Sequence, residues 1–268
     1  MHTISPDDRI QPMTVAEIFR RSMALYRENF LKLIGIVSPP LIVGSIISQF
    51  IFGNNIDEAM ESTTEPGAMG AMFLYAVITI FLSSIVTAAG TTAISERFLN
   101  REISIGESYL RVVDNLFPLF GAVIIASIIM AVGLMLCLIP GAIAAVWFCL
   151  VPPIVMIEGE GGIGALRRSR TLVRGYFRKT FLVVVLLASI QFSVVMIAFS
   201  VPALLKNLFG LYFVAAFIAI LLPLLIEPLK IATTTMLYYD LRIRKEGYNL
   251  EVMAGALTDS TGQLKIEE

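Results

Sequence analysis

The sequence contains one histidine and two cysteines, so few of the side chains that bind metals or perform covalent catalysis are present. The histidine is His2, near the start of the chain, and Cys137 and Cys149 both fall inside apolar stretches. These residues cannot assemble a metal site, and no metal is expected. The two cysteines would lie at different depths on the arms of a helical hairpin, so we expect both to be packed rather than joined by a disulfide.

Motifs typical of catalytic sites are missing as well. The sequence has no GxSxG nucleophile elbow, no HExxH zinc motif and no Walker lysine loop. Gly159, Gly161 and Gly164 match GxGxxG, but no strand is expected before them, and Glu158 and Glu160 would repel a phosphate. We therefore expect a glycine turn before a helix, no cofactor and no enzymatic activity.

Charged residues are scarce: they make up 15% of the 268 residues, against 57% hydrophobic residues and a mean hydropathy of +0.82. Soluble domains carry roughly 25% charged residues, so the composition favours the bilayer as the solvent of this chain. The net charge of -1 shows no basic excess, and no nucleic-acid partner is expected. The first 29 residues hold no continuous apolar core, which argues against a cleavable signal peptide.

What the sequence does contain is long apolar runs. A helix needs about 20 mostly apolar residues to cross the roughly 30 Å hydrocarbon core of a bilayer. Six runs meet this requirement: residues 33–52, 68–94, 116–139, 141–157, 181–205 and 211–239. Only Pro140 and Gly141 mark the boundary between the third and fourth runs, which predicts a tight helical hairpin. We expect an all-α polytopic membrane protein with one six-span domain, residues 14–257, between polar tails at 1–13 and 258–268.

Basic residues are distributed very unevenly between the two sides of this arrangement. With the N-terminus inside, the four inner segments carry five, three, six and four lysines and arginines, whereas the outer connections carry only Lys206. The remaining basic residue, Lys230, lies inside the last run. Because positive residues near span ends accumulate on the cytoplasmic side, we expect both termini to lie in the cytoplasm.

The string RRSxxLxRxxF occurs twice, at residues 20–30 and 167–177, and each copy leads into an apolar run. On a helical wheel its apolar residues and arginines fall on opposite arcs, so we expect amphipathic helices at about 15–30 and 162–179 that lie flat in the membrane interface. A degenerate third copy is expected at 105–117, giving three units of one interfacial helix and two spans. The candidate lipid-headgroup residues are Arg20, Arg21, Arg27, Arg167, Arg168, Arg170, Arg174 and Arg178.

Two proline pairs lie near the inner ends of the first and fourth runs, Pro39-Pro40 in SPPLIV and Pro152-Pro153 in VPPIVM. Each pair frees backbone carbonyls, which in lipid need a neighbouring helix, a hydroxyl group or water. Broken helices in equivalent positions are typical of transport sites. Prolines are also common kinks in packed bundles, and both interpretations stay open.

The intramembrane polar candidates are Glu227, Lys230 and Glu158, of which the first two lie inside the last run. Counting about 1.5 Å per residue from Tyr238 puts Glu227 roughly 16 Å deep, near the midplane. An ionised carboxylate there is costly. We therefore expect either a structural ion pair with Lys230 or a site that couples protons or substrate.

Two rows of small residues follow the second run at intervals of four. They are Ser83, Thr87 and Thr91 in one row and Ser84, Ala88 and Thr92 in the other. Small residues at this spacing allow helices to approach closely. We expect a packing face inside the bundle, with self-association as the alternative.

Three strings carry a resemblance to a family: TVAEIFRRSMALYRENFLKLI, VPPIVMIEGEGGIGALRRSRTLVRGYFRKTF and LYYDLRIRKEGYNLE. They look like the uncharacterised polytopic proteins related to the membrane domain of bacterial glycerophosphoryl diester phosphodiesterases. The most specific pieces are Glu158 with the RRS run, and the tail from Tyr238 to Gly247. In fused relatives a separate soluble barrel performs the hydrolysis, and this chain is too short to include one. The resemblance therefore implies a membrane-domain relative without phosphodiesterase activity, and it implies no catalytic residues.

These observations favour a non-enzymatic membrane module. Its amphipathic helices either anchor the topology of the spans or recognise anionic membrane lipids through their arginines. A membrane or cytoplasmic protein partner is the other candidate for the same basic surface. The alternative function is a transporter or permease-like protein with an intramembrane site near Glu227, and a lipid-active enzyme comes third.

Overall fold

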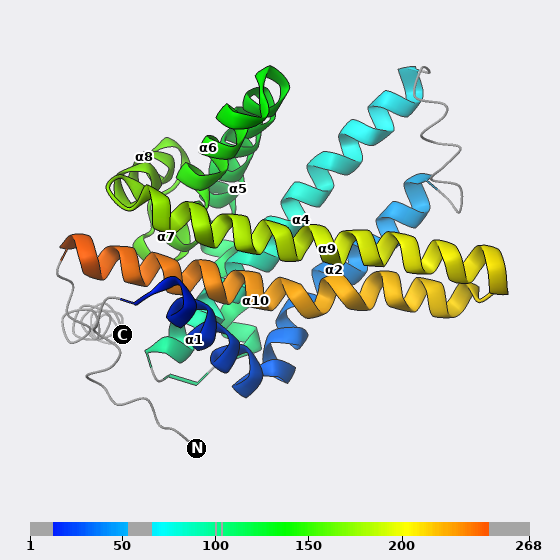
Figure 1. Ribbon diagram of the computed structural model, residues 1–268, viewed down its shortest axis with the longest axis horizontal. Coiled ribbons are helices and arrows are strands. Elements are labelled where there is room, and N and C mark those ends of the chain that lie inside the picture. Colours follow the sequence, from blue (N-terminus) through cyan, green and yellow to red (C-terminus); the bar gives the residue numbers. More distant parts are fainter. Residues whose placement is uncertain (1–12, 53–65, 100, 103, 247–268) are drawn as a thin grey trace, which may run out of the picture.

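The computed structural model describes residues 13–52, 66–99, 101–102 and 104–246, and this part of the chain consists of helices and short connections (Figure 1). In chain order the helices are α1 (Val15–Glu28), α2 (Phe30–Phe52), α4 (Pro66–Phe98), α5 (Ile105–Leu136), α6 (Leu138–Phe148), α7 (Val151–Glu158), α8 (Gly162–Val173), α9 (Phe177–Phe209) and α10 (Tyr212–Glu246). The predicted all-α fold is confirmed.

Six stretches are long and apolar enough to cross a bilayer, as predicted, and the chain is a multi-pass membrane protein. They are Phe30–Ile47, Gly70–Phe98, Ile105–Leu136, Leu138–Glu158, Phe177–Leu205 and Phe217–Glu246. Several helices extend beyond the apolar runs at their charged ends. For example, α5 begins at Ile105 rather than at residue 116, because Ser104 caps it and accepts a hydrogen bond from the backbone N–H of Glu107 at 3.4 Å.

The third amphipathic helix predicted at 105–117 is not a separate element. Helix α5 runs without interruption from Ile105 to Leu136, so this stretch is the first part of a spanning helix. It continues through Pro118 and has no counterpart of the Gly175 turn that separates α8 from α9. The helix predicted at 162–179 likewise ends earlier, at Val173. The expectation of three units, each with a separate interfacial helix before its two spans, is therefore wrong for the described helices.

The turn between α5 and α6 lies at Cys137, earlier than the predicted turn at Pro140 and Gly141. Cys137 is extended, with φ of -172° and ψ of 151°. Pro140 stands in the first turn of α6, where its missing N–H removes no helical hydrogen bond. Both cysteines are free thiols, but Cys137 is exposed at this turn, so the expectation that it is packed is wrong.

The two proline pairs have different consequences. Pro39 and Pro40 lie inside α2, which is continuous, whereas Pro152 and Pro153 stand in the first turn of α7 after the break that follows Phe148. Of the two interpretations left open for the proline pairs, equivalent broken spans are not found among the described helices, since α2 remains whole.

Neighbouring hydroxyl groups bind two of the carbonyls that are freed near these interruptions. Pro40 offers no N–H to the carbonyl of Ile36, which instead accepts a hydrogen bond from Tyr109 Oη. At the end of α6, the carbonyl of Trp147 accepts a hydrogen bond from Ser169 Oγ at 2.6 Å. Such partners are needed in a bilayer because no water is present in its hydrocarbon core.

The buried core lies at the end of the bundle where α1, α7 and α8 pack against the spanning helices. Its largest fully buried side chains include Ile18, Leu33, Ile94, Ile154, Leu172, Tyr238 and Tyr239. The spans pair as the hairpins α2–α4, α5–α6 and α9–α10, and in Figure 1 the α5–α6 and α9–α10 hairpins diverge from this end. Apolar side chains far from the core, such as Met135 and Phe192, are exposed, as expected for surfaces that face lipid.

Gly161 allows α8 to approach α5 closely. It is the N-cap residue of α8, and a Cβ atom at this position would lie 2.4 Å from Pro118 Cβ. The glycine-rich string that formally matches GxGxxG therefore serves helix packing at this position.

Gly161→Ala is expected to destabilise the protein, because the added methyl group overlaps Pro118 and overpacking costs about 1–3 kcal/mol. The measurement is the midpoint of thermal unfolding in detergent. Gly121→Ala in α5 is the control, since a Cβ there meets no atom within 4 Å and alanine favours the helix. An unchanged midpoint for Gly161→Ala would contradict the close approach of α8 and α5.

Candidate functional site

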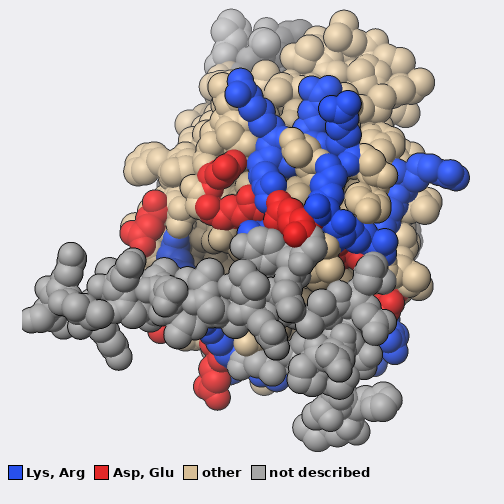
Figure 2. Space-filling model, turned by 90° about the vertical axis from the view of Figure 1, so that its left-hand side faces the viewer, with Lys and Arg blue, Asp and Glu red and all other residues tan. Residues whose placement is uncertain are grey.

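Charged side chains gather at the core end of the molecule. Figure 2 shows lysines, arginines and acidic residues together on the face that lies at the left of Figure 1. Ion pairs at this end involve residues of α1, α8 and the C-terminal part of α10. The candidate site is built from these elements.

The second arginine of each RRSxxLxRxxF copy forms an ion pair within the protein. In α1, Arg21 is 9% exposed and its Nη2 lies 3.2 Å from Glu17 Oε1. In α8, Arg168 binds Glu158 with two donors, Nε to Oε2 at 2.7 Å and Nη2 to Oε1 at 3.1 Å. Both arginines were predicted as lipid-headgroup candidates, and the structure directs both toward carboxylates of the protein.

Glu158 lies at the centre of a polar cluster formed with Arg168, Tyr238, Arg242 and Glu246. Tyr238 Oη donates a hydrogen bond to Glu158 Oε1 at 2.8 Å, and Arg242 Nη1 donates to Tyr238 Oη at 2.8 Å. Glu246 forms an ion pair with Arg168. Its Oε2 atom also lies 3.0 Å from Arg242 Nε. The hydrogen bond to Glu158 raises the pKa of Arg168 above its usual value, which keeps this side chain charged. The polar cluster ties α7, α8 and the end of α10 together.

A second ionic cluster surrounds Asp240, which is fully buried. The backbone N–H of Met13 donates to Asp240 Oδ1 at 2.7 Å, Arg244 Nε lies 3.1 Å from both carboxylate oxygens, and Lys179 pairs with Oδ2. The carbonyl of Met13 accepts hydrogen bonds from Lys179 and Arg244 at 2.6 and 2.8 Å. Asp240 and Lys179 were not among the site residues predicted from the sequence. The available signal was an acidic residue directly after the apolar and aromatic end of the last run.

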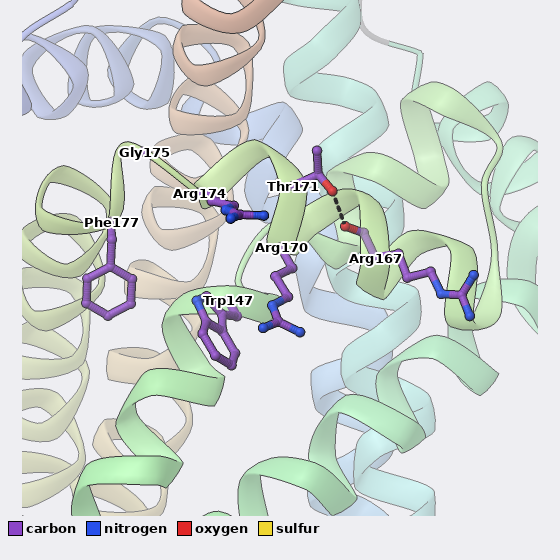
Figure 3. Close-up of a pocket in the computed structure, with 7 residues that line it drawn as sticks. All are labelled: Trp147, Arg167, Arg170, Thr171, Arg174, Gly175 and Phe177. Carbon is purple, nitrogen blue, oxygen red and sulfur yellow. Dashed lines mark hydrogen bonds between the residues drawn. The ribbon is translucent and has the colours of Figure 1, made fainter.

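A pocket of about 650 Å³ lies beside α8 (Figure 3). We call it the arginine pocket. It is lined by Trp147, Arg167, Arg170, Thr171, Arg174, Gly175 and Phe177. The guanidinium carbon of Arg170 lies 4.4 Å from the centre of the Trp147 ring, a cation–π contact. In Figure 3, Arg170 extends toward Trp147, and Arg167 extends away from it.

A glycine turn shapes the arginine pocket. Helix α8 ends at Val173, Arg174 is extended, and Gly175 has a φ of 97°, in the left-handed region that glycine adopts readily. The N–H of Tyr176 donates to the carbonyl of Val173 at 3.0 Å, and α9 then begins at Phe177. The turn thus ends the amphipathic helix, starts the span and places Arg174 and Phe177 in one pocket.

Three positive charges in the arginine pocket form no ion pair with a carboxylate of the described residues. They belong to Arg167, Arg170 and Arg174. Guanidinium groups bind phosphates and carboxylates through parallel hydrogen bonds. The arginine pocket is therefore suited to an anion, and Trp147 and Phe177 supply apolar contact surface beside it.

The first copy of the string has a pocket at the equivalent place, with a different charge. This first-copy pocket measures about 490 Å³ and is lined by Arg27, Glu28, Asn29, Phe30, Leu31, Lys32, Arg97 and Glu102. Within the string, Glu28 stands where the second copy has Gly175, and Met23 stands where it has Arg170. Glu28 pairs with Arg97 at 3.9 Å. Carboxylates therefore offset the positive charge of the first-copy pocket and weaken it as an anion site.

The other predicted arginines lie outside the arginine pocket. Arg20 is exposed on α1 and lies 3.8 Å from Glu17, and Arg27 lines the first-copy pocket. Arg178 belongs to α9 and does not line the arginine pocket.

Glu227 and Lys230 form an ion pair in the last span, with Oε1 and Nζ 2.5 Å apart. Their side chains are 14% and 37% exposed. Lys230 lines an intramembrane cavity of about 420 Å³ between α4, α5, α7, α9 and α10, whereas Glu227 is not a lining residue. The structure thus brings the two predicted charges together and opens a cavity beside the lysine.

The two small-residue rows of α4 have different surroundings. Ser84, Ala88 and Thr92 are buried, as predicted for a packing face. Thr87 and Thr91 of the other row line the intramembrane cavity. One row therefore packs the bundle, and the other presents hydroxyl-bearing side chains to a cavity.

Glu158→Gln is expected to destabilise the protein by about 1–3 kcal/mol, because Arg168 loses its charged acceptor. The midpoint of thermal unfolding in detergent measures the effect. Glu160→Gln is the matched control, since Glu160 is exposed and forms no ion pair with any described residue. Equal midpoints for the two variants would show that the polar cluster does not hold α8 in place.

Comparison with known protein families matches residues 106–241 to the family described as "Domain of unknown function (DUF7847)". The matched region runs from α5 to α10 and contains the arginine pocket and most of the polar cluster. The match provides no link to the membrane domain of glycerophosphoryl diester phosphodiesterases. No curated protein and no solved structure matches the chain. Because the matched residues make up half of its length, this protein belongs to the DUF7847 family.

Proposed function

We propose that this protein is a non-enzymatic integral membrane module that binds the headgroups of anionic lipids in the arginine pocket. The observation that carries the proposal is the grouping of Arg167, Arg170 and Arg174, which have no ion-pair partner among the described residues, beside Trp147 and Phe177. The guanidinium group of an arginine can donate two parallel hydrogen bonds to the oxygens of a phosphate. Tryptophan is enriched at membrane interfaces. An anionic lipid supplies both the phosphate and the apolar body that this pocket suits.

A lipid fits the position of the arginine pocket better than a protein partner does. Phe177 is the first residue of α9, a spanning helix, so the pocket lies where a span enters the bilayer. A protein partner would have to present carboxylates at the level of the lipid headgroups. A lipid phosphate is already at that level.

The charge distribution supports a cytoplasmic location for the arginine pocket. The segment between the fourth and fifth predicted runs carries six of the basic residues, and the outer connections carry one. This asymmetry favours both termini in the cytoplasm. The prokaryotic inner membrane is part of the proposal because the resemblance is to bacterial proteins.

A relation to the membrane domain of glycerophosphoryl diester phosphodiesterases is part of the same proposal. The residues that carry the resemblance, Glu158, the RRS run and the tail from Tyr238, supply the polar cluster that joins α7, α8 and α10. A structure of such a membrane domain should contain the same cluster. If the equivalent glutamate in that structure paired with a residue other than the equivalent of Arg168, the proposed relation would be wrong.

Trp147 is the single tryptophan of the chain and lies in the arginine pocket, so its fluorescence reports binding there directly. We expect brominated phosphatidylglycerol to quench Trp147 at lower concentration than brominated phosphatidylcholine in detergent micelles. Replacing Arg167, Arg170 and Arg174 with Gln should remove this preference. At about 1 kcal/mol per basic residue, the loss is about 3 kcal/mol, or roughly 100-fold in affinity.

The control replaces Arg97, Arg101 and Arg111 with Gln, which removes the same charge. These arginines pair with Glu28 or Glu96. The control variant should keep the preference for phosphatidylglycerol. Equal quenching by the two lipids in the wild-type protein would overturn the proposal.

A second candidate function, a transporter with an intramembrane site near Glu227, is favoured by the cavity beside Lys230. Transport requires that this cavity open to both sides of the membrane. In a protein without its native cysteines, Thr234→Cys should then react with an impermeant maleimide added to either side of oriented vesicles. Thr171→Cys in the arginine pocket is the control that should react from one side. Reaction of Thr234→Cys from one side at most would remove this candidate.

A further inference from the structure

The first-copy pocket lies where two spans reach the level of the lipid headgroups. Helix α2 begins at Phe30, and Arg97 stands in the last turn of α4, whose span ends at Phe98. Both helix ends line the pocket, together with Glu102 from the connection that follows α4. Leu31, another lining residue, is 82% exposed. A molecule in this pocket therefore meets charged side chains and an exposed apolar side chain at the start of a span.

Opposite charges share this pocket, and most of them do not pair with each other. The lining contains the cations Arg27, Lys32 and Arg97 and the carboxylates Glu28 and Glu102. Glu28 and Arg97 make one contact of 3.9 Å between two exposed side chains. None of the ion pairs formed by the described residues involves Arg27, Lys32 or Glu102. Two cations and one carboxylate of the pocket are therefore available to a ligand.

This arrangement favours a ligand that itself carries both charges. Arginine and lysine bind phosphate oxygens through charge-assisted hydrogen bonds. A purely anionic headgroup would bring its charge close to Glu28 and Glu102, and like charges repel. A primary ammonium group has three N–H donors and binds a carboxylate directly. A headgroup with a phosphate and a primary ammonium group therefore suits both kinds of side chain.

We propose that the first-copy pocket binds the headgroup of a zwitterionic aminophospholipid, of the chemical class of phosphatidylethanolamine. The phosphate oxygens accept hydrogen bonds from Arg27 and Lys32, and the ammonium group donates to Glu102. The acyl chains lie along Leu31 and the apolar start of α2. The headgroup of phosphatidylcholine has the same net charge, but its methylated ammonium group has no N–H donor. This site is separate from the arginine pocket and does not depend on the function proposed for that pocket.

The first test uses a series of lipids on the wild-type protein. Dioleoylphosphatidylethanolamine, its N-methyl and N,N-dimethyl derivatives and dioleoylphosphatidylcholine share their charge and acyl chains but lose one N–H donor at each step. Native mass spectrometry of the detergent-solubilised protein gives the bound fraction of each lipid. We expect phosphatidylethanolamine to bind about three- to tenfold more tightly than phosphatidylcholine, the effect of about one hydrogen bond. The largest loss should come with the last methyl group, because the dimethyl derivative still has one donor.

Three variants locate the site. Glu102→Gln should no longer distinguish phosphatidylethanolamine from phosphatidylcholine, which makes a double-mutant cycle with the lipid pair. Replacing both Arg27 and Lys32 with Gln should weaken binding of the two lipids by a similar factor, about tenfold or more, because both carry the phosphate. Glu107→Gln is the matched control. It removes the same charge from an exposed residue that does not line the pocket, and it should keep the preference.

The outcomes separate this site from the arginine pocket. Loss of the preference in Glu102→Gln, with unchanged quenching of Trp147 by brominated phosphatidylglycerol, supports a second and distinct lipid site. Equal binding of phosphatidylethanolamine and phosphatidylcholine by the wild-type protein would overturn the proposal, as would a preference that survives in Glu102→Gln. Displacement of the lipid by an equal concentration of soluble glycerophosphoethanolamine would overturn the lipid as the ligand. Because Glu102 is exposed, its replacement leaves the packing of the helices unchanged.

Discussion

The ion pair between Glu158 and Arg168 determines how α8 is placed, and the arginine pocket depends on that placement. At 100° per residue, positions 167 and 170 lie about 60° apart around a helix, and position 168 lies about 100° from position 167. With Arg168 directed to Glu158, the helix has one orientation about its axis. Arg170 then meets Trp147, and Arg174 meets the turn before α9. An internal contact of one arginine thus positions the three that have no ion-pair partner among the described residues.

The bilayer imposes a second constraint, because backbone groups at membrane depth must find partners within the protein. Tyr109 binds the carbonyl that Pro40 leaves free in α2, and that helix stays whole. Where the fourth span is interrupted, Ser169 of α8 binds the last turn of α6. The amphipathic helix α8 therefore supplies a hydrogen-bond donor to the interrupted span and also forms part of the arginine pocket. This dual role explains why a break in a span and a charged surface helix occur side by side.

The sequence predicts the spans well and the site only in part. The spans depend on consecutive residues, whereas the site depends on contacts between residues that lie far apart in the chain. Hydropathy is a property of consecutive residues, so all six spans were found, while the charged helix ends fell outside the apolar runs. The arginines of the pocket were visible as a helical stripe, but Trp147 reaches them only through the fold. Asp240 was missed because its partners, Met13 and Lys179, lie far away in the chain. No local sequence pattern predicts which carbonyl left free by a proline will be bound by a hydroxyl group from a distant part of the chain.

The two copies of RRSxxLxRxxF show what the shared letters encode. In both copies the second arginine pairs with a glutamate of the protein, and the final phenylalanine begins a spanning helix. The copies differ at unspecified positions: Met23 against Arg170, and Glu28 against Gly175. The first change adds a cation beside Trp147, and the second removes a carboxylate from the pocket. The shared letters therefore encode how an amphipathic helix docks at the entry of a span. The anion site arises from residues that the string leaves free.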